Sequence, residues 1–358
     1  MPDQLSTAFA TDADAFAERM VGALNEAAMV AMTAVGHRLG LFDAMADASW
    51  LTSHEVAGRA ACAERYVREW LSCLAVARVL DHDPATARFR LPQAHAAALT
   101  RAASPANIAV SAQFVSMMGA MEDRLCAAFR SGAGIGYEAY TRFHEVMAED
   151  SGQTVVAALD DHILPLIPEL RSRLEAGIRV ADLGCGAGHA LLALAERFPH
   201  SAFVGYDLCA EPIAQARQLA ARRGLDNVAF EARDLAVRPA TGPFDWITTF
   251  DAVHDQADPA ALLASIRRAL APGGVYLMQD IAGSACVHHN HATPLAPLFY
   301  AVSTVHCTPV SLAQGGPGLG TMWGEETMRT MLAAAGFGAV ACHHLPHDIA
   351  NVYVVARP

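Results

Sequence analysis

Lysine is absent from this sequence, in which all 25 basic residues are arginines. Without a lysine amine, the chain has no side chain for Schiff-base chemistry or for an amine base. Charged residues are scarce at 17%, and the formal net charge is -12. Nucleic acids and anionic membranes attract basic surfaces, so neither is expected as a partner. The eight cysteines include no C-x-x-C pair, which indicates neither a disulfide framework nor a thiolate metal site.

The sequence also lacks the segments that direct a chain to or through a membrane. Residues 1–20 contain no basic region followed by an apolar run, so no signal peptide is predicted. The long uncharged run at residues 281–324 is interrupted by prolines and by a glycine cluster, which excludes a membrane helix. We therefore expect a soluble, cytoplasmic protein.

The first third of the chain has the pattern of a winged helix. The segments TSHEVAGRA and ERYVREWLSCLAVARVL predict two short helices, and VLDHD and ARFRL predict a small hairpin. In the second helix, one face carries apolar side chains at helical spacing: Val67, Trp70, Leu71 and Leu74. Its polar positions are balanced in charge rather than basic, which argues against DNA binding: Glu64, Arg65, Arg68 and Glu69.

From Ile178 onward, strands alternate with helices. This order is typical of right-handed crossovers, and it predicts an α/β fold with a doubly wound, mainly parallel sheet of seven strands. Two late segments, FGAVACHHL and NVYVVAR, are expected to form an antiparallel pair. We expect a winged-helix-like domain at residues 1–105, a helical connector at 106–175 and the α/β domain at 176–358, with a lid insert at 282–324.

A glycine-rich turn follows the first strand of the α/β domain. Gly184, Gly186 and Gly188 stand between Asp182 and the next predicted helix. Glycines let a backbone approach a ligand closely, and a helix N-terminus offers free amides. The spacing G-x-G-x-G differs from the G-x-G-x-x-G of dinucleotide binders, which argues against NAD.

Acidic residues end three successive strands: Asp182, Asp207 and Asp234. Because strand ends in such sheets line the ligand crevice, these carboxylates are expected to face a ligand. Asp207 lies 19 residues after Gly188, a distance suited to a carboxylate that binds ribose hydroxyls. Asp234 could accept a hydrogen bond from an adenine amino group.

Together, D-L-G-C-G-A-G, Y-D-L and A-R-D-L resemble the class I S-adenosylmethionine-dependent methyltransferase pattern over residues 178–358. The resemblance implies S-adenosylmethionine as the cofactor. It places the glycines under the methionine part, Asp207 at the ribose, and Asp234 with Leu235 at the adenine. The cofactor residues predicted in this way are Asp182, Gly184, Gly186, Gly188, Asp207, Leu208, Asp234, Leu235 and Phe250.

The N-terminal half of the sequence adds to this resemblance. A winged-helix-like module before such a domain is similar to small-molecule methyltransferases of secondary metabolism, which dimerise through it, so a homodimer is expected. RFHEVMAEDS resembles a segment of those enzymes in which the residues matching Met147 and Ser151 lie near cofactor and acceptor. Together with FDAVHDQADP, it resembles the winged-helix mycobacterial-type subgroup, related to plant-type O-methyltransferases.

His254 and Asp255 follow the fourth predicted strand, on the side of the sheet where an acceptor must lie. The H-D pair is similar to that of plant-type O-methyltransferases, which implies His254 as the general base and Asp255 beside it. The structural alternative is a histidine that bonds to backbone at the end of a strand.

A second hypothesis for His254 involves a metal. In LAPLFYAVSTVHC, a helix would place Phe299, Val302 and His306 on one face of the insert. His254 and His306, with Asp255 as a third ligand, could then hold a divalent or ferric ion that stabilises the enolate of an α-keto acid for C-methylation, as in related α-keto-acid C-methyltransferases. A buried histidine packed in an apolar helix explains His306 equally well.

Two alternatives stay open. A winged-helix regulator that senses S-adenosylmethionine or a metabolite is the competing function, and DNA binding would support it. The cluster His288, His289 and His291 could bind a metal or simply occupy an exposed loop. The main prediction is a methyltransferase that acts on a small-molecule acceptor.

Overall fold

The computed structural model describes residues 12–358, and the chain divides into two compact units, Met1–Ser116 and Met117–Pro358. Helix α5 (Ala109–Ala120) crosses the boundary between them. No helix among the described residues combines the length and the apolar character needed to cross a membrane. The domain boundaries predicted from the sequence remain predictions.

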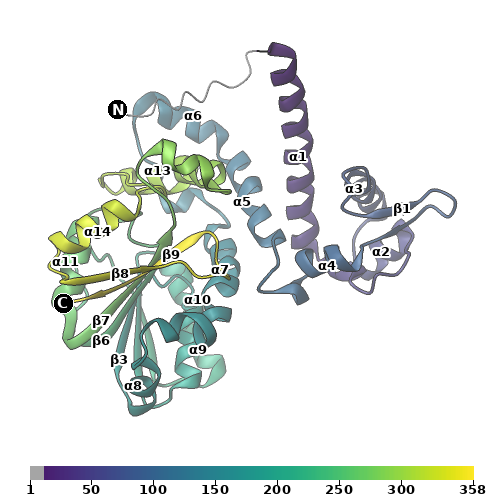
Figure 1. The fold of residues 1–358 in the computed structure, drawn as a ribbon. Coiled ribbons are helices and arrows are strands. Elements are labelled where there is room, and N and C mark those ends of the chain that lie inside the picture. The colour runs from purple at the N-terminus through teal and green to yellow at the C-terminus, as the bar shows by residue number, and fades with distance from the viewer. Residues whose placement is uncertain (1–11) are drawn as a thin grey trace. The chain divides into compact units, whose positions relative to one another are not determined.

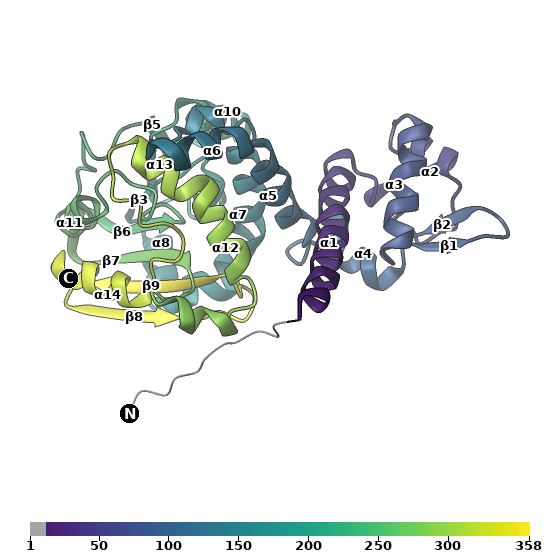
Figure 2. The same ribbon diagram turned by 90° about the horizontal axis from the view of Figure 1, so that it is seen from above.

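The N-terminal unit is helical with one two-stranded hairpin (Figures 1 and 2). Its elements are α1 (Ala13–Leu39), α2 (Ser53–Arg59), α3 (Glu64–Val76), β1 (Asp81–Asp83), β2 (Arg88–Arg90) and α4 (Gln93–Leu99). The two helices and the hairpin predicted from the sequence are confirmed, and the apolar face of α3 is buried as expected. The indole of Trp70 donates to the carbonyl of Met32, which ties α3 to α1.

The basic side chains on the outer face of α3 are paired within the helix. Arg68 forms an ion pair with Glu64, and Arg65 forms one with Glu69. An arginine that is already neutralised by a carboxylate one turn away is poorly placed to hold a phosphate. The absence of DNA binding stays a prediction from the charge balance of the sequence.

The C-terminal unit is built on a seven-stranded sheet, as predicted. Its strands are β3 (Arg179–Leu183), β4 (Ala202–Asp207), β5 (Val228–Ala232), β6 (Phe244–Phe250), β7 (Leu270–Ile281), β8 (Ala339–His343) and β9 (Asn351–Arg357). Their order is β5-β4-β3-β6-β7-β9-β8, and only β9 runs antiparallel to its neighbours. The order reverses beside β3, and ligands of open α/β sheets bind at such a point.

Helices cover both faces of this sheet (Figures 1 and 2). The α-helices that lie wholly within this unit are α6 (Glu122–Ser131), α7 (Phe143–Thr154), α8 (Leu170–Ala176), α9 (His189–Arg197), α10 (Ala210–Arg223), α11 (Pro259–Ala269), α12 (Ala296–Val302), α13 (Thr308–Ala313) and α14 (Glu325–Ala334), and not all of them lie against the sheet. One apolar core joins the sheet to α8, α9 and α10, and a second joins it to α11 and α14. Large side chains such as Trp246, Tyr276 and Tyr353 are fully buried in these cores.

Candidate functional site

One pocket lies at the carboxyl ends of β3, β4 and β6 and is closed on one side by α7. Every residue that the sequence predicts for the cofactor lines it. These residues are Met147, Ser151, Asp182, Gly184, Gly186, Gly188, Asp207, Leu208, Asp234, Leu235 and Phe250. Asp255 also lines this pocket, whereas His254 and His306 are buried behind its wall.

Two glycines of the turn after β3 are required for different reasons. Both adopt the left-handed conformation, with φ of 51° at Gly186 and 71° at Gly188. A Cβ added at Gly188 would lie 2.3 Å from the ring of Phe230, so packing excludes a larger residue. A Cβ added at Gly186 would meet no atom within 4 Å, which leaves open space over this part of the turn.

Asp207 fixes the glycine turn and stays part of the pocket wall. Its Oδ2 accepts from the amide of Gly186 at 2.8 Å, and its Oδ1 accepts from the amide of Cys209 at 2.8 Å. Burial raises the pKa of Asp207, while these two amides oppose the shift. The carboxylate keeps free lone pairs toward the pocket, where it can accept hydrogen bonds from a bound ligand.

Asp182 is the most deeply enclosed carboxyl of the wall. Its Oδ1 accepts from the hydroxyl of Thr248 at 2.8 Å. Burial raises the pKa of Asp182 to about 7, in spite of this hydrogen bond. The group therefore titrates near neutral pH and moderates the negative charge of the pocket.

His254 follows β6 and is held in one orientation. Its Nδ1 donates to Oδ1 of Asp280 at 2.8 Å, and the same oxygen accepts from the indole of Trp323 at 3.1 Å. The Nε2 atom therefore faces Oδ1 of Asp255, 3.4 Å away. Burial by itself lowers the pKa of His254, but the carboxylates of Asp280 and Asp255 outweigh it and raise this pKa well above 6.5.

Asp255 lies between His254 and the pocket. The Tyr137 hydroxyl donates to Oδ2 of Asp255 at 3.3 Å, and Nδ1 of His306 is 3.7 Å from the same oxygen. Burial, and then the Asp255 charge, raise the pKa of Tyr137. Asp255 thus connects the two histidines that the sequence proposed as a metal pair, and it alone of the three reaches the pocket wall.

His306 is a neutral ring in an aromatic cage. It stacks on Phe143 with 3.6 Å between ring centroids and meets the edge of Tyr140 at 4.7 Å. Neither ring nitrogen has a hydrogen-bond partner among the described residues. Burial lowers the pKa of His306 to about 4.

The helix predicted for the insert does not present one continuous face. After α12, residues Ser303–Cys307 form a π turn, which places one more residue in the turn than an α-helix does. Phe299 packs with Ala296 and Met322, whereas His306 packs against Phe143 of α7. The prediction of a shared face for Phe299, Val302 and His306 was therefore wrong.

Several residues at this site were missed by the sequence analysis. Asp280 is the next-to-last residue of β7, so the pattern of carboxylates at strand ends could have found it. Tyr137, His144 and Gln314 also line the pocket, but they come from segments whose approach no local pattern announces.

Comparisons with known proteins agree with this architecture. The model of the Rv2258c-like winged HTH domain matches residues 27–101, and that of a methyltransferase domain matches residues 174–336. Demethylmenaquinone methyltransferase of Thermus thermophilus is 30% identical over 197 residues, which cover 50% of this chain and 83% of that protein.

Two further proteins are similar to parts or to the whole of the chain. Trans-aconitate 2-methyltransferase of Methylobacterium nodulans is 37% identical over 109 residues, and the match spans 30% of this chain but only 40% of that protein. The structure of human N-acetylserotonin methyltransferase in complex with SAM superposes with a TM-score of 0.66 and 18% identity, covering 98% of this chain and 99% of that chain. This chain therefore belongs to the methyltransferase family, with an Rv2258c-like winged helix–turn–helix domain ahead of its methyltransferase domain.

Proposed function

We propose that this protein transfers a methyl group from S-adenosylmethionine to a hydroxyl of a small-molecule acceptor. The observation that carries the proposal is the single pocket lined by every residue that the sequence predicted for the cofactor. The buried His254, Asp255 and Asp280 lie at and behind the wall of the same pocket, so one site combines a ligand cradle with a group able to take a proton.

The pocket fits the proposed cofactor. The space over Gly186 would be filled by a Cβ, as expected for a backbone approached closely by a ligand. Asp207 would hold the ribose hydroxyls, Asp234 and Leu235 the adenine, and Met147 with Ser151 the other side. S-adenosylmethionine would supply an already activated methyl group, so the protein has to orient the acceptor, exclude water and remove a proton.

The proton would be removed by Asp255 and His254 acting together. Asp255 is the group at the pocket wall, where its carboxylate can accept the hydrogen bond of an acceptor hydroxyl. His254 Nε2, held toward Asp255 because Nδ1 is bound to Asp280, is the atom that would store the proton. The pair works as a base only when His254 is neutral, so we expect activity to rise with pH.

The metal-assisted alternative fits the residues less well. The buried group of potential ligand atoms within 4.8 Å consists of His254, Asp255 and Cys307, without the His306 that this alternative requires. Burial raises the pKa of Cys307 to about 12, which disfavours the thiolate that a metal would need. C-methylation through a metal remains a prediction, and O-methylation is the version that we propose.

The N-terminal unit supports a homodimer. On α1, large apolar side chains are exposed at positions one turn apart, among them Phe16, Met20 and Leu24. An exposed apolar stripe of this kind is costly in water unless a partner covers it. We propose that a second copy of the chain does so.

A matched pair of glycine substitutions tests the proposed function. Gly186→Ala adds a methyl group at φ 51° in the pocket, and Gly224→Ala adds one at φ 67° after α10, where a Cβ also meets nothing within 4 Å. Both variants should lose about 1–2 kcal/mol of stability because alanine is strained at positive φ. Only Gly186→Ala should weaken binding of S-adenosylhomocysteine, the demethylated product, by at least about tenfold, or about 1.4 kcal/mol, in calorimetry.

Two results of these titrations would contradict the proposal. A wild-type chain that binds neither the cofactor nor its product would remove the basis of the proposed function. An equal loss of affinity in Gly186→Ala and Gly224→Ala would show that the turn after β3 is not where the ligand lies.

A further inference from the structure

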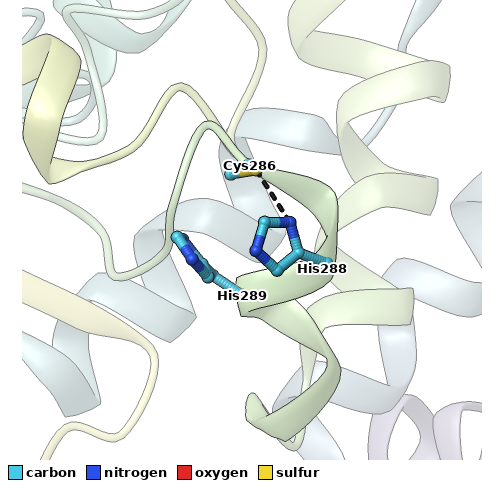
Figure 3. Close-up of side chains that lie close together, drawn as sticks. All are labelled: Cys286, His288 and His289. Atoms are coloured by element: carbon cyan, nitrogen blue, oxygen red, sulfur yellow. Dashed lines mark hydrogen bonds between the residues drawn. The ribbon is translucent and has the colours of Figure 1, made fainter. Parts of the chain in front are cut away.

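Cys286, His288 and His289 form a cluster outside the pocket. They lie on the short turn after β7, at residues 286–289, and all three are exposed. One possible ligand atom from each lies within 4.8 Å of the others, and Figure 3 shows the three side chains gathered on the same turn. We propose that this cluster is a zinc site, a role independent of methyl transfer.

The backbone of the turn brings the ligands together. The amide of His289 donates to the carbonyl of Cys286 at 3.0 Å, and in such a 3₁₀ turn residues three apart lie on one side. Cys286 Sγ is 3.0 Å from Nδ1 of His288. Ligand atoms of a tetrahedral zinc ion are about 3.3–3.6 Å apart, and the three candidate atoms lie within 4.8 Å of one another, so rotations of these exposed side chains would bring them to the spacing that the ion requires.

The turn is anchored before any ion binds. Asn290 is buried; its Oδ1 accepts from the amide of Ser284 at 2.9 Å and its Nδ2 donates to the carbonyl of Ser284 at 2.7 Å. The same Nδ2 donates to the hydroxyl of Tyr300 at 2.9 Å. The backbone that carries the cluster is therefore fixed to α12, which reduces the entropy that a ligand would have to remove.

A hydrogen-bond relay orients His289. Its Nδ1 is 3.3 Å from the hydroxyl of Ser284, which in turn donates to Oε1 of Glu326 at 2.9 Å. Because the serine hydroxyl donates to the carboxylate, it accepts from Nδ1–H and leaves Nε2 of His289 as the free lone pair. Metal-binding histidines usually have a polar partner of this kind on the other nitrogen.

The donor set selects the class of ion. One thiolate and two imidazoles suit zinc, and hard ions such as magnesium or calcium prefer oxygen. Three protein ligands leave the fourth position to water, which exposure of the cluster allows. A bound ion would join both ends of the 3₁₀ turn at the beginning of the insert and stabilise that segment.

The test uses the untagged, reduced chain after treatment with a chelator. Cobalt(II), which replaces zinc and reports thiolate ligation by a charge-transfer band, should bind at one equivalent and be displaced by zinc. Cys286→Ser should abolish the band, and Cys126→Ser, at another exposed cysteine, should retain it. Ser284→Ala, which removes the partner of His289, should weaken zinc affinity about 10- to 100-fold.

Three results would overturn the proposal: no thiolate band in the wild-type chain, a band that survives Cys286→Ser but is lost in Cys307→Ser, or an unchanged zinc affinity in Ser284→Ala. As a second readout, zinc should raise the Tm of the wild-type chain and leave that of Cys286→Ser unchanged. Because none of these positions lines the cofactor pocket, binding of S-adenosylhomocysteine should be the same in the Cys286→Ser and wild-type chains.

Discussion

Replacing His306 by phenylalanine should make the protein less sensitive to acid. The buried imidazole has a pKa of about 4, against 6.5 for an ordinary histidine. Between these values the unfolded chain binds a proton that the folded chain does not, so this residue lowers stability as the pH falls. His306→Phe keeps a ring against Phe143 and removes the titrating group.

The size of the effect follows from the two pKa values. At pH 7.5 the difference between the two pKa values of the imidazole lowers the free energy of unfolding by almost nothing, and at pH 5.5 it lowers it by about 1.4 kcal/mol. Acidification from pH 7.5 to 5.5 therefore removes about 1.3 kcal/mol of stability through this residue. A larger ring in a packed site costs about 1–3 kcal/mol at every pH, and this constant cancels when one pH is compared with the other.

The assay is urea unfolding of the wild-type chain and of His306→Phe at both pH values. The variant should lose about 1.3 kcal/mol less than the wild type on acidification. Phe143→Leu is the control, because it disturbs the same stack while the imidazole remains. If the wild type and His306→Phe lose the same stability on acidification, His306 is not a neutral buried ring and the reasoning fails.

Two further predictions concern the base and the dimer. Asp280→Asn removes a carboxylate that raises the pKa of His254, so the rising limb of the pH–rate profile should move to lower pH. The maximal rate should also fall. A rising limb at the same pH as in the wild type would show that His254 is not the titrating base. Leu24→Asp places a charge on the exposed apolar stripe of α1, so sedimentation should show a monomeric variant and a dimeric wild type. If both the variant and the wild type are dimers, the interface lies elsewhere.

Much of the fold was predictable from the sequence. Strands such as 179–183 and 202–207 are largely apolar and have an aspartate as their last or next-to-last residue, and the helices between them have a clear 3.6-residue period. The glycine turn and Asp207 were found for the same reason, because strand and helix fix their relative positions within a few residues.

The acceptor side of the site was less predictable. The contact between Tyr137 and Asp255 joins residues 118 positions apart, and no local pattern encodes such an approach. The π turn at Ser303–Cys307 depends on packing around His306 and Phe143 rather than on the helical period of the insert. Sequence periodicity therefore predicted the sheet and the glycine turn that lines the pocket, whereas tertiary packing decided what surrounds His254.

The π turn also affects how this family member could diverge. One additional residue in a helical turn changes the orientation of the residues after it by about 100°, so losing that residue would rotate the side chain at position 306 away from Phe143. The seven strands and the glycine turn lie outside this segment and would be untouched. A single-codon deletion or insertion here would thus change the packing behind Asp255 while the glycine turn of the pocket stays unchanged.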